Sequence, residues 1–216
     1  MMLGARTAAW SPSGAPLPYD AEVEYLENTG NQWIKTDFIP DQYSQLEFSF
    51  MNLNHDTSIY NLWVSGTFSS KDTRNLFGVR ITKSDSEIEC FTMPVRLHYY
   101  GQNIGIKLNA QFRDKTWTIG DVASDVASDF TCRAPLPLFG INYGTTSYDY
   151  RVGAQFIGRI YSFKAWQNGT LVRDFIPVRF ANEDGASEGA MFDKASGRLF
   201  RNAGTDALVI GPDKTT

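Results

Sequence analysis

The feature that most constrains this fold is a series of short segments rich in β-branched and aromatic residues, separated by turn-forming residues. The clearest segment is 45–50, where Leu46, Phe48 and Phe50 alternate with polar residues. A period of two places these three side chains on one face of a strand, so we expect that face to lie on a core and the other to face solvent. Segments of the same kind are 59–64, 76–82, 87–92, 95–100, 116–119, 136–141 and 156–166.

Turn-forming residues between these segments predict how they are joined. Asn168-Gly169 separates two apolar runs, and this dipeptide readily supplies the two positive-φ residues of a two-residue hairpin turn. Ser196-Gly197 predicts a second hairpin with a longer loop. Apart from residues 121–129, no segment shows the sustained 3.6-residue period of a helix. The pattern therefore predicts an all-β protein, a sandwich or barrel.

Length and composition predict that the chain has two parts, a β domain and an N-terminal arm. A chain of 216 residues is long enough for one large β domain, so we assign residues 21–216 to a single sandwich. Residues 1–20 contain three prolines among small residues and predict an extended N-terminal arm. The apolar residues of this arm, Trp10, Leu17 and Tyr19, are too few to fold alone and would suit docking onto another protein subunit. The alternative is a leader, or a linker from a larger surface protein.

Charge and hydropathy bear on partners and location. The 24 acidic and 20 basic residues are scattered and give a formal net charge of -4, so a nucleic-acid partner is not expected. No apolar stretch approaches the ~20 residues that span a bilayer, so membrane insertion is not expected. Arg6 interrupts the segment where a signal peptide has its apolar core, so we expect another route to a virion or cell surface. Cys90 and Cys132 could be buried thiols or one disulfide.

Three motifs carry a resemblance to a known family. They are EYLENTGNQWIKTDF at 24–38, GRIYSFKAWQNGTLVRDFIPV at 158–178 and MFDKASGRLFRNAGT at 191–205. Together they resemble the laminin-G-like branch of the concanavalin A-like lectin and glucanase superfamily, in the form found in gut bacteria and their phages. The resemblance extends over about residues 22–211 and is weakest in the middle of the chain.

This resemblance implies a two-sheet antiparallel jelly-roll sandwich, with an N-terminal hairpin, a long strand with an Asn-Gly turn and a closing hairpin. Ligands of such domains usually bind on the concave face or at the end loops, and members of the family bind sugars or proteins. The matched motifs themselves are interpreted as structural. Asp193 is expected to cap its own turn, and Asn202-Ala203-Gly204 to permit a left-handed bend.

Glycosidases of this superfamily carry three carboxylates at alternate positions on one strand, because two of them must flank the scissile bond. Asp85, Glu87 and Glu89 alternate in this way, although their order and neighbours differ from the hydrolase motif, and a solvated strand face is the favoured interpretation. His55 and His98 lie in no metal-ligand pair and near no nucleophile motif. We therefore assign no catalytic residue, no metal and no cofactor.

Two further patterns are interpreted as structural. Asp121, Asp125 and Asp129 are four residues apart, which would place them on one face of a short helix or in a calcium-binding loop. Calcium loops usually take ligands from alternate positions, so an exposed loop is favoured. Asn168-Gly169-Thr170 matches the glycosylation acceptor pattern, but the same residues form the predicted hairpin turn.

The segment 140–153, GINYGTTSYDYRVG, is the strongest candidate for a ligand-binding loop. Aromatic rings pack against the C–H faces of sugars, while amides, carboxylates and guanidinium groups bind the hydroxyls. The same rings could instead contact a protein or plug the end of the sandwich. We predict that at least two of the three tyrosine rings are exposed at one end or edge. The candidate residues are Asn142, Tyr143, Tyr148, Asp149, Tyr150 and Arg151.

A second set, in residues 96–100, could line the concave face. Strand alternation places His98 and Tyr100 on one side and Tyr99 on the other, so only part of the set that also includes Arg96 can face one ligand.

The leading hypothesis is a non-catalytic glycan-binding or adhesion module of a phage virion or another surface assembly. Its expected partners are a glycan or cell-surface polysaccharide and other protein subunits, with a homo-oligomer as one form. The first alternative is a purely structural decoration or assembly protein with no glycan site. The second is a divergent glycoside hydrolase that uses Glu87 and Glu89.

Overall fold

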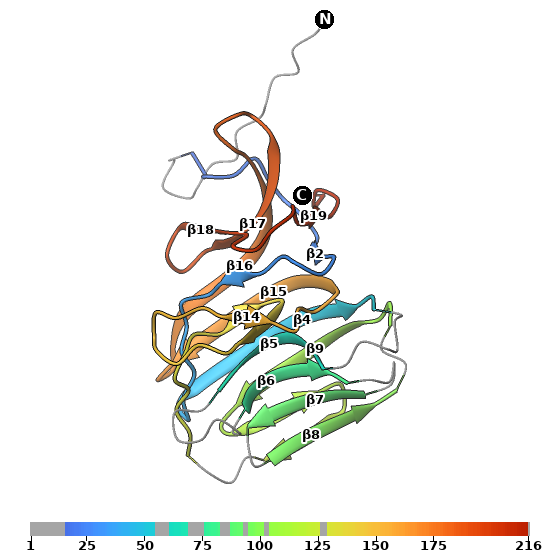
Figure 1. Cartoon of the computed structure of the whole chain (residues 1–216), viewed down its shortest axis with the longest axis vertical. Coiled ribbons are helices and arrows are strands. Elements are labelled where there is room, and N and C mark those ends of the chain that lie inside the picture. The colour runs from blue at the N-terminus through green and yellow to red at the C-terminus, as the bar shows by residue number, and fades with distance from the viewer. Residues whose placement is uncertain are drawn as a thin grey trace, which may run out of the picture.

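The computed structural model describes residues 16–54, 61–68, 76–82, 87–92, 95–101, 104–125 and 129–215. Within these ranges the regular elements are strands, and no helix occurs. The strands form two large sheets that pack face to face (Figure 1), so the predicted all-β sandwich is confirmed. None of the described residues belongs to a helix long and apolar enough to cross a membrane.

The larger sheet, called the large sheet below, has a central run of eight antiparallel strands. β1(Ala21–Glu22) pairs with one of them, and β2(Leu26–Asn28) pairs both with the central run and with β19(Val209–Ile210). The order of the run is β11(Val122–Asp125), β10(Thr116–Ile119), β9(Lys107–Arg113), β4(Ser44–Asn52), β15(Gly158–Gln167), β16(Thr170–Ala181), β17(Ser187–Asp193) and β18(Arg198–Arg201).

The second sheet, called the six-stranded sheet below, faces the large sheet in the lower part of Figure 1. Its strands are antiparallel except for the parallel pair of β13 and β5. A short ladder of β3(Ile34–Lys35) with β12(Pro137–Leu138) lies beside it. The order is β14(Val152–Gly153), β13(Gly140–Asn142), β5(Leu62–Phe68), β6(Leu76–Ile81), β7(Glu87–Thr92) and β8(Val95–Tyr100).

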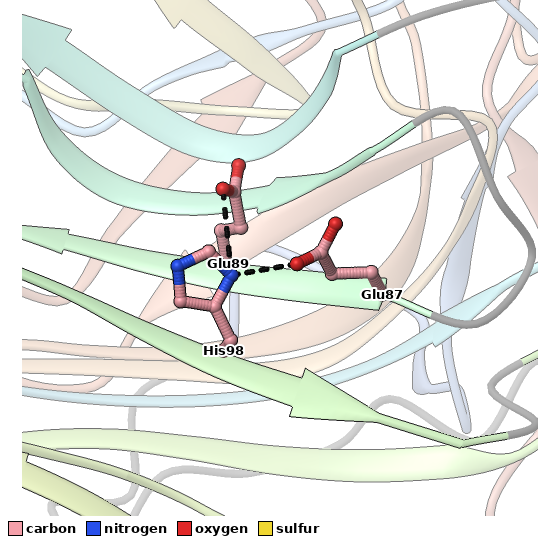
Figure 2. A group of neighbouring side chains, drawn as sticks. All are labelled: Glu87, Glu89 and His98. Carbon is pink, nitrogen blue, oxygen red and sulfur yellow. Dashed lines mark hydrogen bonds and ion pairs between the residues drawn. The ribbon is translucent and has the colours of Figure 1, made fainter.

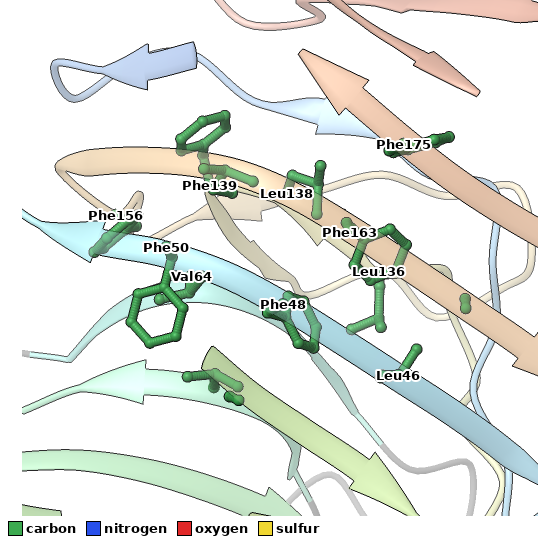
Figure 3. Close-up of a cluster of buried hydrophobic side chains, with 14 of the residues drawn as sticks. Leu46, Phe48, Phe50, Val64, Leu136, Leu138, Phe139, Phe156, Phe163 and Phe175 are labelled. Atoms are coloured by element: carbon green, nitrogen blue, oxygen red, sulfur yellow. The ribbon is translucent and has the colours of Figure 1, made fainter. Parts of the chain in front are cut away.

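An aromatic core fills the space between the sheets. Leu46, Phe48 and Phe50 of β4 are all buried in it, as the alternation predicts, and Figure 3 shows Phe50 next to Val64 of the facing sheet, with Phe48 and Leu46 further along β4. On the other face of β4, Gln45 and Glu47 are partly exposed as predicted, whereas Ser49 is buried. Burial of each such side chain contributes about 1.5 to 3 kcal/mol to folding.

Trp117 connects the two sheets by a directed interaction as well as by packing. Its ring lies 5.5 Å from Phe77 and 5.1 Å from Phe112, between centroids, so it contacts both sheets. Its indole Nε1 donates to the Phe91 carbonyl at 3.1 Å and to the Thr92 hydroxyl at 2.9 Å, both on β7. The buried donor is thereby satisfied by the sheet that it faces.

The predicted segments agree closely with the strands, with two departures. Segments 87–92, 95–100 and 116–119 coincide with β7, β8 and β10. Segment 136–141 is broken, because Phe139 takes a φ of 66° and separates β12 from β13. The strand β9 was not predicted, although its apolar and polar residues alternate, because it contains no β-branched residue and a single aromatic one. Residues 59 and 60 lie outside the described ranges.

Both C-terminal hairpins form where the turn residues predict them. Asn168 and Gly169 have φ values of 50° and 75° between β15 and β16, which confirms the two-residue turn. Asp193 caps the loop between β17 and β18: its Oδ1 accepts from the Ala195 amide at 3.1 Å and its Oδ2 from the Ser196 hydroxyl at 2.7 Å. The capping role assigned to Asp193 is therefore confirmed.

Two expectations from the resemblance are wrong. The N-terminal motif does not form a hairpin, because β2 pairs with β15 and β19 whereas β3 pairs with β12. Gly204 does not provide a left-handed bend; the positive φ nearby, 61°, belongs to Asp206. Gly204 is required for another reason, since a Cβ there would lie 2.0 Å from the Asn31 carbonyl oxygen.

The described end of the N-terminal arm packs on its own chain. Tyr19 is 9% exposed and its ring lies 4.9 Å from that of Phe192, in a cluster that Leu17 borders. The Asp20 amide donates to the Arg179 carbonyl at 2.8 Å. Tyr19 is therefore not available to dock another subunit, because it is buried on this chain's own apolar surface, and Leu17 is half-buried beside it. Trp10 lies outside the described residues.

Residues 121–125 do not form a helix; Asp121 lies in a turn and the rest form β11. They belong to the β10–β11 hairpin, in which Ile119 pairs with Val122 and Thr116 with Asp125. The side chain of Asp125 accepts from the Thr116 hydroxyl at 2.7 Å, and Asp129 pairs with Lys115. The exposed-loop interpretation is thus wrong for Asp125, which belongs to β11, and confirmed for Asp121 in the turn and Asp129 outside the strands; all three lie at the surface.

Cys90 and Cys132 are both free and buried, so the disulfide alternative is wrong. Burial raises the pKa of each thiol, and both remain protonated at neutral pH.

Replacing Gly169 by Val should destabilise the protein by about 1 kcal/mol or more, because a β-branched residue resists positive φ. Nothing lies within 4 Å of a Cβ at this position, so the loss would come from the backbone and not from a clash. Urea unfolding measures it, with Thr170→Val on the adjoining exposed strand position as control. Equal stability of the two variants would contradict the assigned turn.

Candidate functional site

The candidate loop connects β13 to β14 at one edge of the six-stranded sheet. Tyr148 is 91% exposed and Tyr143 is 44% exposed, so two of the three tyrosine rings are accessible at this edge, as predicted. One side of the Tyr143 ring rests on Phe68, with centroids 5.6 Å apart, and partial burial raises the pKa of its hydroxyl. The rings can therefore contact a partner from outside the sheet.

Asn142 holds this loop together and is not a ligand-binding residue. It is completely buried, and its Oδ1 accepts from the amides of Gly144 at 2.9 Å and Arg151 at 3.0 Å. Its Nδ2 donates to the carbonyls of Pro135 at 2.9 Å and Asp149 at 3.0 Å. These bonds occupy both ends of the amide, so the ligand-binding assignment of Asn142 is wrong.

Tyr150 anchors the loop to the body of the sandwich. Its ring stacks on Trp33, with centroids 5.4 Å apart, and Lys35 Nζ lies 5.3 Å from the ring centre. The hydroxyl accepts from the Asp37 amide at 2.9 Å and donates to the Asp37 carboxylate at 3.2 Å. Burial raises the pKa of this hydroxyl well above its usual range. Tyr150 therefore has the plug role that was the alternative for these rings.

The charged residues of the loop pair with each other. Arg151 Nε lies 3.1 Å from Asp149 Oδ2, and the Arg151 side chain is 71% exposed. Gly144 allows the loop to fold this tightly, because a Cβ there would lie 2.1 Å from the Asp149 carbonyl oxygen. Of the six predicted residues, the structure thus presents Tyr143, Tyr148 and Arg151 to solvent on a closely held backbone.

A second group of polar residues lies on the outer face of the six-stranded sheet, away from the core. His98 and Tyr100 of β8 point to this face with their rings stacked 6.0 Å apart, whereas Tyr99 packs against the core. The predicted alternation of these residues is therefore confirmed. Across the ladder, β7 contributes Glu87 and Glu89 to the same face.

Figure 2 shows Glu87, Glu89 and His98 converging on one point. His98 Nδ1 lies 2.6 Å from Glu87 Oε1 and 3.7 Å from Glu89 Oε1. Burial alone would raise the pKa of Glu87, but hydrogen bonds from His98, Thr82 and Tyr100 outweigh it and hold that pKa below its usual value.

Glu89 is buried, which contradicts the expectation of a solvated strand face. Arg80 forms an ion pair with its carboxylate and also donates through Nε at 2.8 Å, and Arg96 Nη1 approaches at 3.6 Å. The two guanidinium groups also lie over the Phe91 ring, at 4.5 Å and 5.1 Å from its centre. Charge, hydrogen bonds and an apolar cover are thus all supplied to Glu89 by neighbouring residues.

One ligand atom from each of Glu87, Glu89 and His98 lies within 4.8 Å of the others, so this cluster is the described group that could hold a metal ion. A cation there would share Glu89 with Arg80, whose guanidinium already neutralises that carboxylate. The arrangement fits a charge-balanced network better than a metal centre. Asp85 and His55, the other residues considered for chemistry, lie outside the described ranges.

No protein-family model and no curated protein matches this chain. A solved structure with a similar fold is that of the mouse laminin alpha1 chain, domains LG4-5, with 14% sequence identity and a TM-score of 0.49. The alignment covers 94% of this chain and 49% of that one, so this chain spans about half the length of that protein. A similarity at this level says nothing about what the chain binds, and the description of the fold rests on the sheets themselves.

Proposed function

We propose that this protein is a non-catalytic binding module that recognises a glycan or cell-surface polysaccharide through the β13–β14 loop. The observation that carries the proposal is the exposure of Tyr143 and Tyr148 beside the exposed guanidinium of Arg151. Aromatic faces suit the C–H patches of sugar rings, and a guanidinium donates to their hydroxyls or to acidic sugars. The set therefore has both kinds of contact that a saccharide needs.

The rigidity of the loop supports this proposal. Asn142 ties both ends of the loop together through four hydrogen bonds, and Tyr150 fastens its C-terminal half to Asp37. A loop held in one shape loses little conformational freedom when it binds, so more of the contact energy appears as affinity. Exposed rings on an unsupported loop would lose that advantage.

The non-catalytic part of the proposal rests on the acidic pair. A glycosidase needs one carboxyl group that stays protonated as the general acid, which requires a raised pKa. Hydrogen bonds keep the pKa of Glu87 low, and Glu89 is engaged by Arg80 in a buried ion pair. Neither residue has the environment of a general acid, so hydrolysis is the less favoured function.

The proposed setting is a phage virion or another surface assembly, in which residues 1–15 attach the sandwich to other subunits or to further copies of itself. Trp10 in a proline-rich segment is the sequence feature in favour of attachment. The resemblance of the C-terminal motifs to domains of gut phages and bacteria points the same way. A structural decoration protein with no glycan site remains the competing function, and glycan binding distinguishes the two.

Replacing Tyr148 by Ala should weaken glycan binding by about 1 to 3 kcal/mol and leave the free energy of unfolding nearly unchanged, because the ring is exposed. A glycan array identifies the ligand, and titration calorimetry with the best hit measures the loss. The matched control is Tyr43→Ala, since Tyr43 is 60% exposed and lies outside the β13–β14 loop. Binding that is insensitive to Tyr148, or an array without hits, would favour the decoration protein.

Arg80→Ala should destabilise the protein by about 3 kcal/mol, because it leaves the buried Glu89 carboxylate without its main partner. Arg96→Ala is the control and should cost less than about 1 kcal/mol, since Arg96 is 44% exposed and more distant. Chemical denaturation measures both.

In parallel, no reducing sugar should be released from β-glucans. Release that is abolished by Glu87→Gln would establish the hydrolase instead.

Truncation tests the attachment segment. Removing residues 1–15 keeps Tyr19 in place and should yield a folded sandwich that no longer forms oligomers or attaches to particles. Removing residues 1–20 should in addition cost about 2 kcal/mol of stability, because the buried Tyr19 ring is lost. Sedimentation analysis distinguishes the assemblies. A chain that assembles equally well without residues 1–15 would refute the role of this segment.

A further inference from the structure

A groove of about 300 Å³ lies on the outer face of the large sheet, the face turned away from the core. Four neighbouring strands, β10, β9, β4 and β15, contribute its lining. The residues that line it are polar apart from Phe48 and Gly120, and the polar ones are Glu47, Ser49, Asn109, Gln111, Thr118 and Ser162. The β13–β14 loop is at the edge of the other sheet, so the groove is a separate site.

The strand register explains why the sheet is hollow at this point. Ser49 pairs with Asn109 on one side and with Ser162 on the other, so two of the three neighbouring side chains are short. The next row on one side is formed by the longer Gln111 and Glu47. Short side chains between longer ones leave a depression in a sheet face.

Tyr161 lies on the same outer face but does not line the groove. Tyr161 occupies a β-bulge next to Ser162 and lies over Met51, with its hydroxyl 3.6 Å from the Met51 sulfur. Lys107 Nζ lies 4.3 Å from the centre of the same ring, which keeps Tyr161 on this face.

Ser49 gives the strongest indication of a ligand. It is 7% exposed, and its hydroxyl makes no hydrogen bond to another protein group. Buried polar atoms in folded proteins are nearly always bonded, so an exception calls for an explanation. Ser49 lines the groove but its hydroxyl is covered, so a hydroxyl-bearing molecule in the groove would supply the partner that the fold does not once the serine side chain rotates toward it.

The lining selects the chemistry of that molecule. Glu47, the acidic residue of the lining, is paired at 3.4 Å with Arg113 outside it, and no lysine or arginine lines the groove, so the lining offers no free positive charge to an anion. Six polar side chains disfavour a hydrophobic ligand. Glu47 accepts from Gln111 Nε2 at 2.9 Å, which leaves the carbonyl of that amide free to accept, while Asn109 is exposed and can both donate and accept. A neutral polyhydroxyl compound fits this mixture of donors and acceptors.

We infer that this groove is a second saccharide-binding site, which takes one or two neutral sugar units against Asn109, Gln111 and Ser49. Its volume is at the small end of the range of ligand sites, about 300 to 1,000 Å³. The site holds a single carboxylate among its described residues, so it binds a sugar and does not cleave it. The inference does not depend on the loop proposed above.

Amide chemical-shift mapping of the full chain tests this inference. The probes are the methyl glycosides of glucose, galactose, mannose, fucose and N-acetylglucosamine. At least one of them should shift the side-chain amides of Asn109 and Gln111 and the backbone amides of Ser49 and Ser162. Asn109→Ala and Gln111→Ala should each weaken that binding by about fivefold, the equivalent of one hydrogen bond. Thr116→Ala, on the same face but outside the lining, should bind as the unchanged chain does.

The two proposed sites fail separately in this experiment. Shifts confined to Tyr143 and Tyr148 would overturn the groove and leave the loop proposal standing. Shifts in the groove that persist in Tyr148→Ala would establish the groove even if the loop binds nothing. The absence of shifts at Asn109, Gln111 and Ser49 with all five glycosides would overturn the inference.

Discussion

The hydrogen bond from Trp117 of β10 to Phe91 and Thr92 of β7 is the contact on which the arrangement of the two sheets depends. Apolar burial favours contact between two sheets but specifies no orientation, because it is not directional. A buried indole N–H must find an acceptor, and the acceptors lie at one place on the facing strand. The aromatic rings around it, including Phe77 and Phe112, then pack in one arrangement. Because the two sheets are oriented by this contact, the positions of their outer faces and edge loops depend on it as well.

Much of the fold follows from sequence because its signals are local. The alternation in β4 and the Asn168-Gly169 turn each depend only on residues adjacent in the chain, and both were predicted correctly. The partners of β2 and β3 could not be predicted, since pairing between distant strands depends on the whole topology. The same limit applies to Leu17 and Tyr19, whose apolar character predicts burial but not which surface buries them.

The candidate site shows the same division. Residue type correctly marked a loop with two accessible tyrosines, although the loop is only 143–151, because the ends of segment 140–153 belong to β13 and β14. It could not separate Tyr148 from Tyr150, because the difference is a contact with Trp33 and Asp37 more than a hundred residues away in the chain. Asn142 was misassigned for a related reason: an amide that binds a ligand and an amide that ties a loop are the same residue type. The groove was missed because Ser49 and Glu47 appear only as the polar half of an alternating strand.

The bulge in β15 has a meaning beyond the shape of the groove. Ile160 and Phe163 both face the core although they are three residues apart, which strict alternation forbids, and the additional residue between them reconciles the two. A strand one residue shorter would alternate normally and bury the same two side chains. Burial of the core side chains therefore does not require the extra residue. Tyr161 makes its contacts on the outer surface, where its ring lies against Tyr25, Met51 and Lys107. The extra residue in β15 is therefore explained by the contacts of Tyr161 on the outer surface and not by packing in the core.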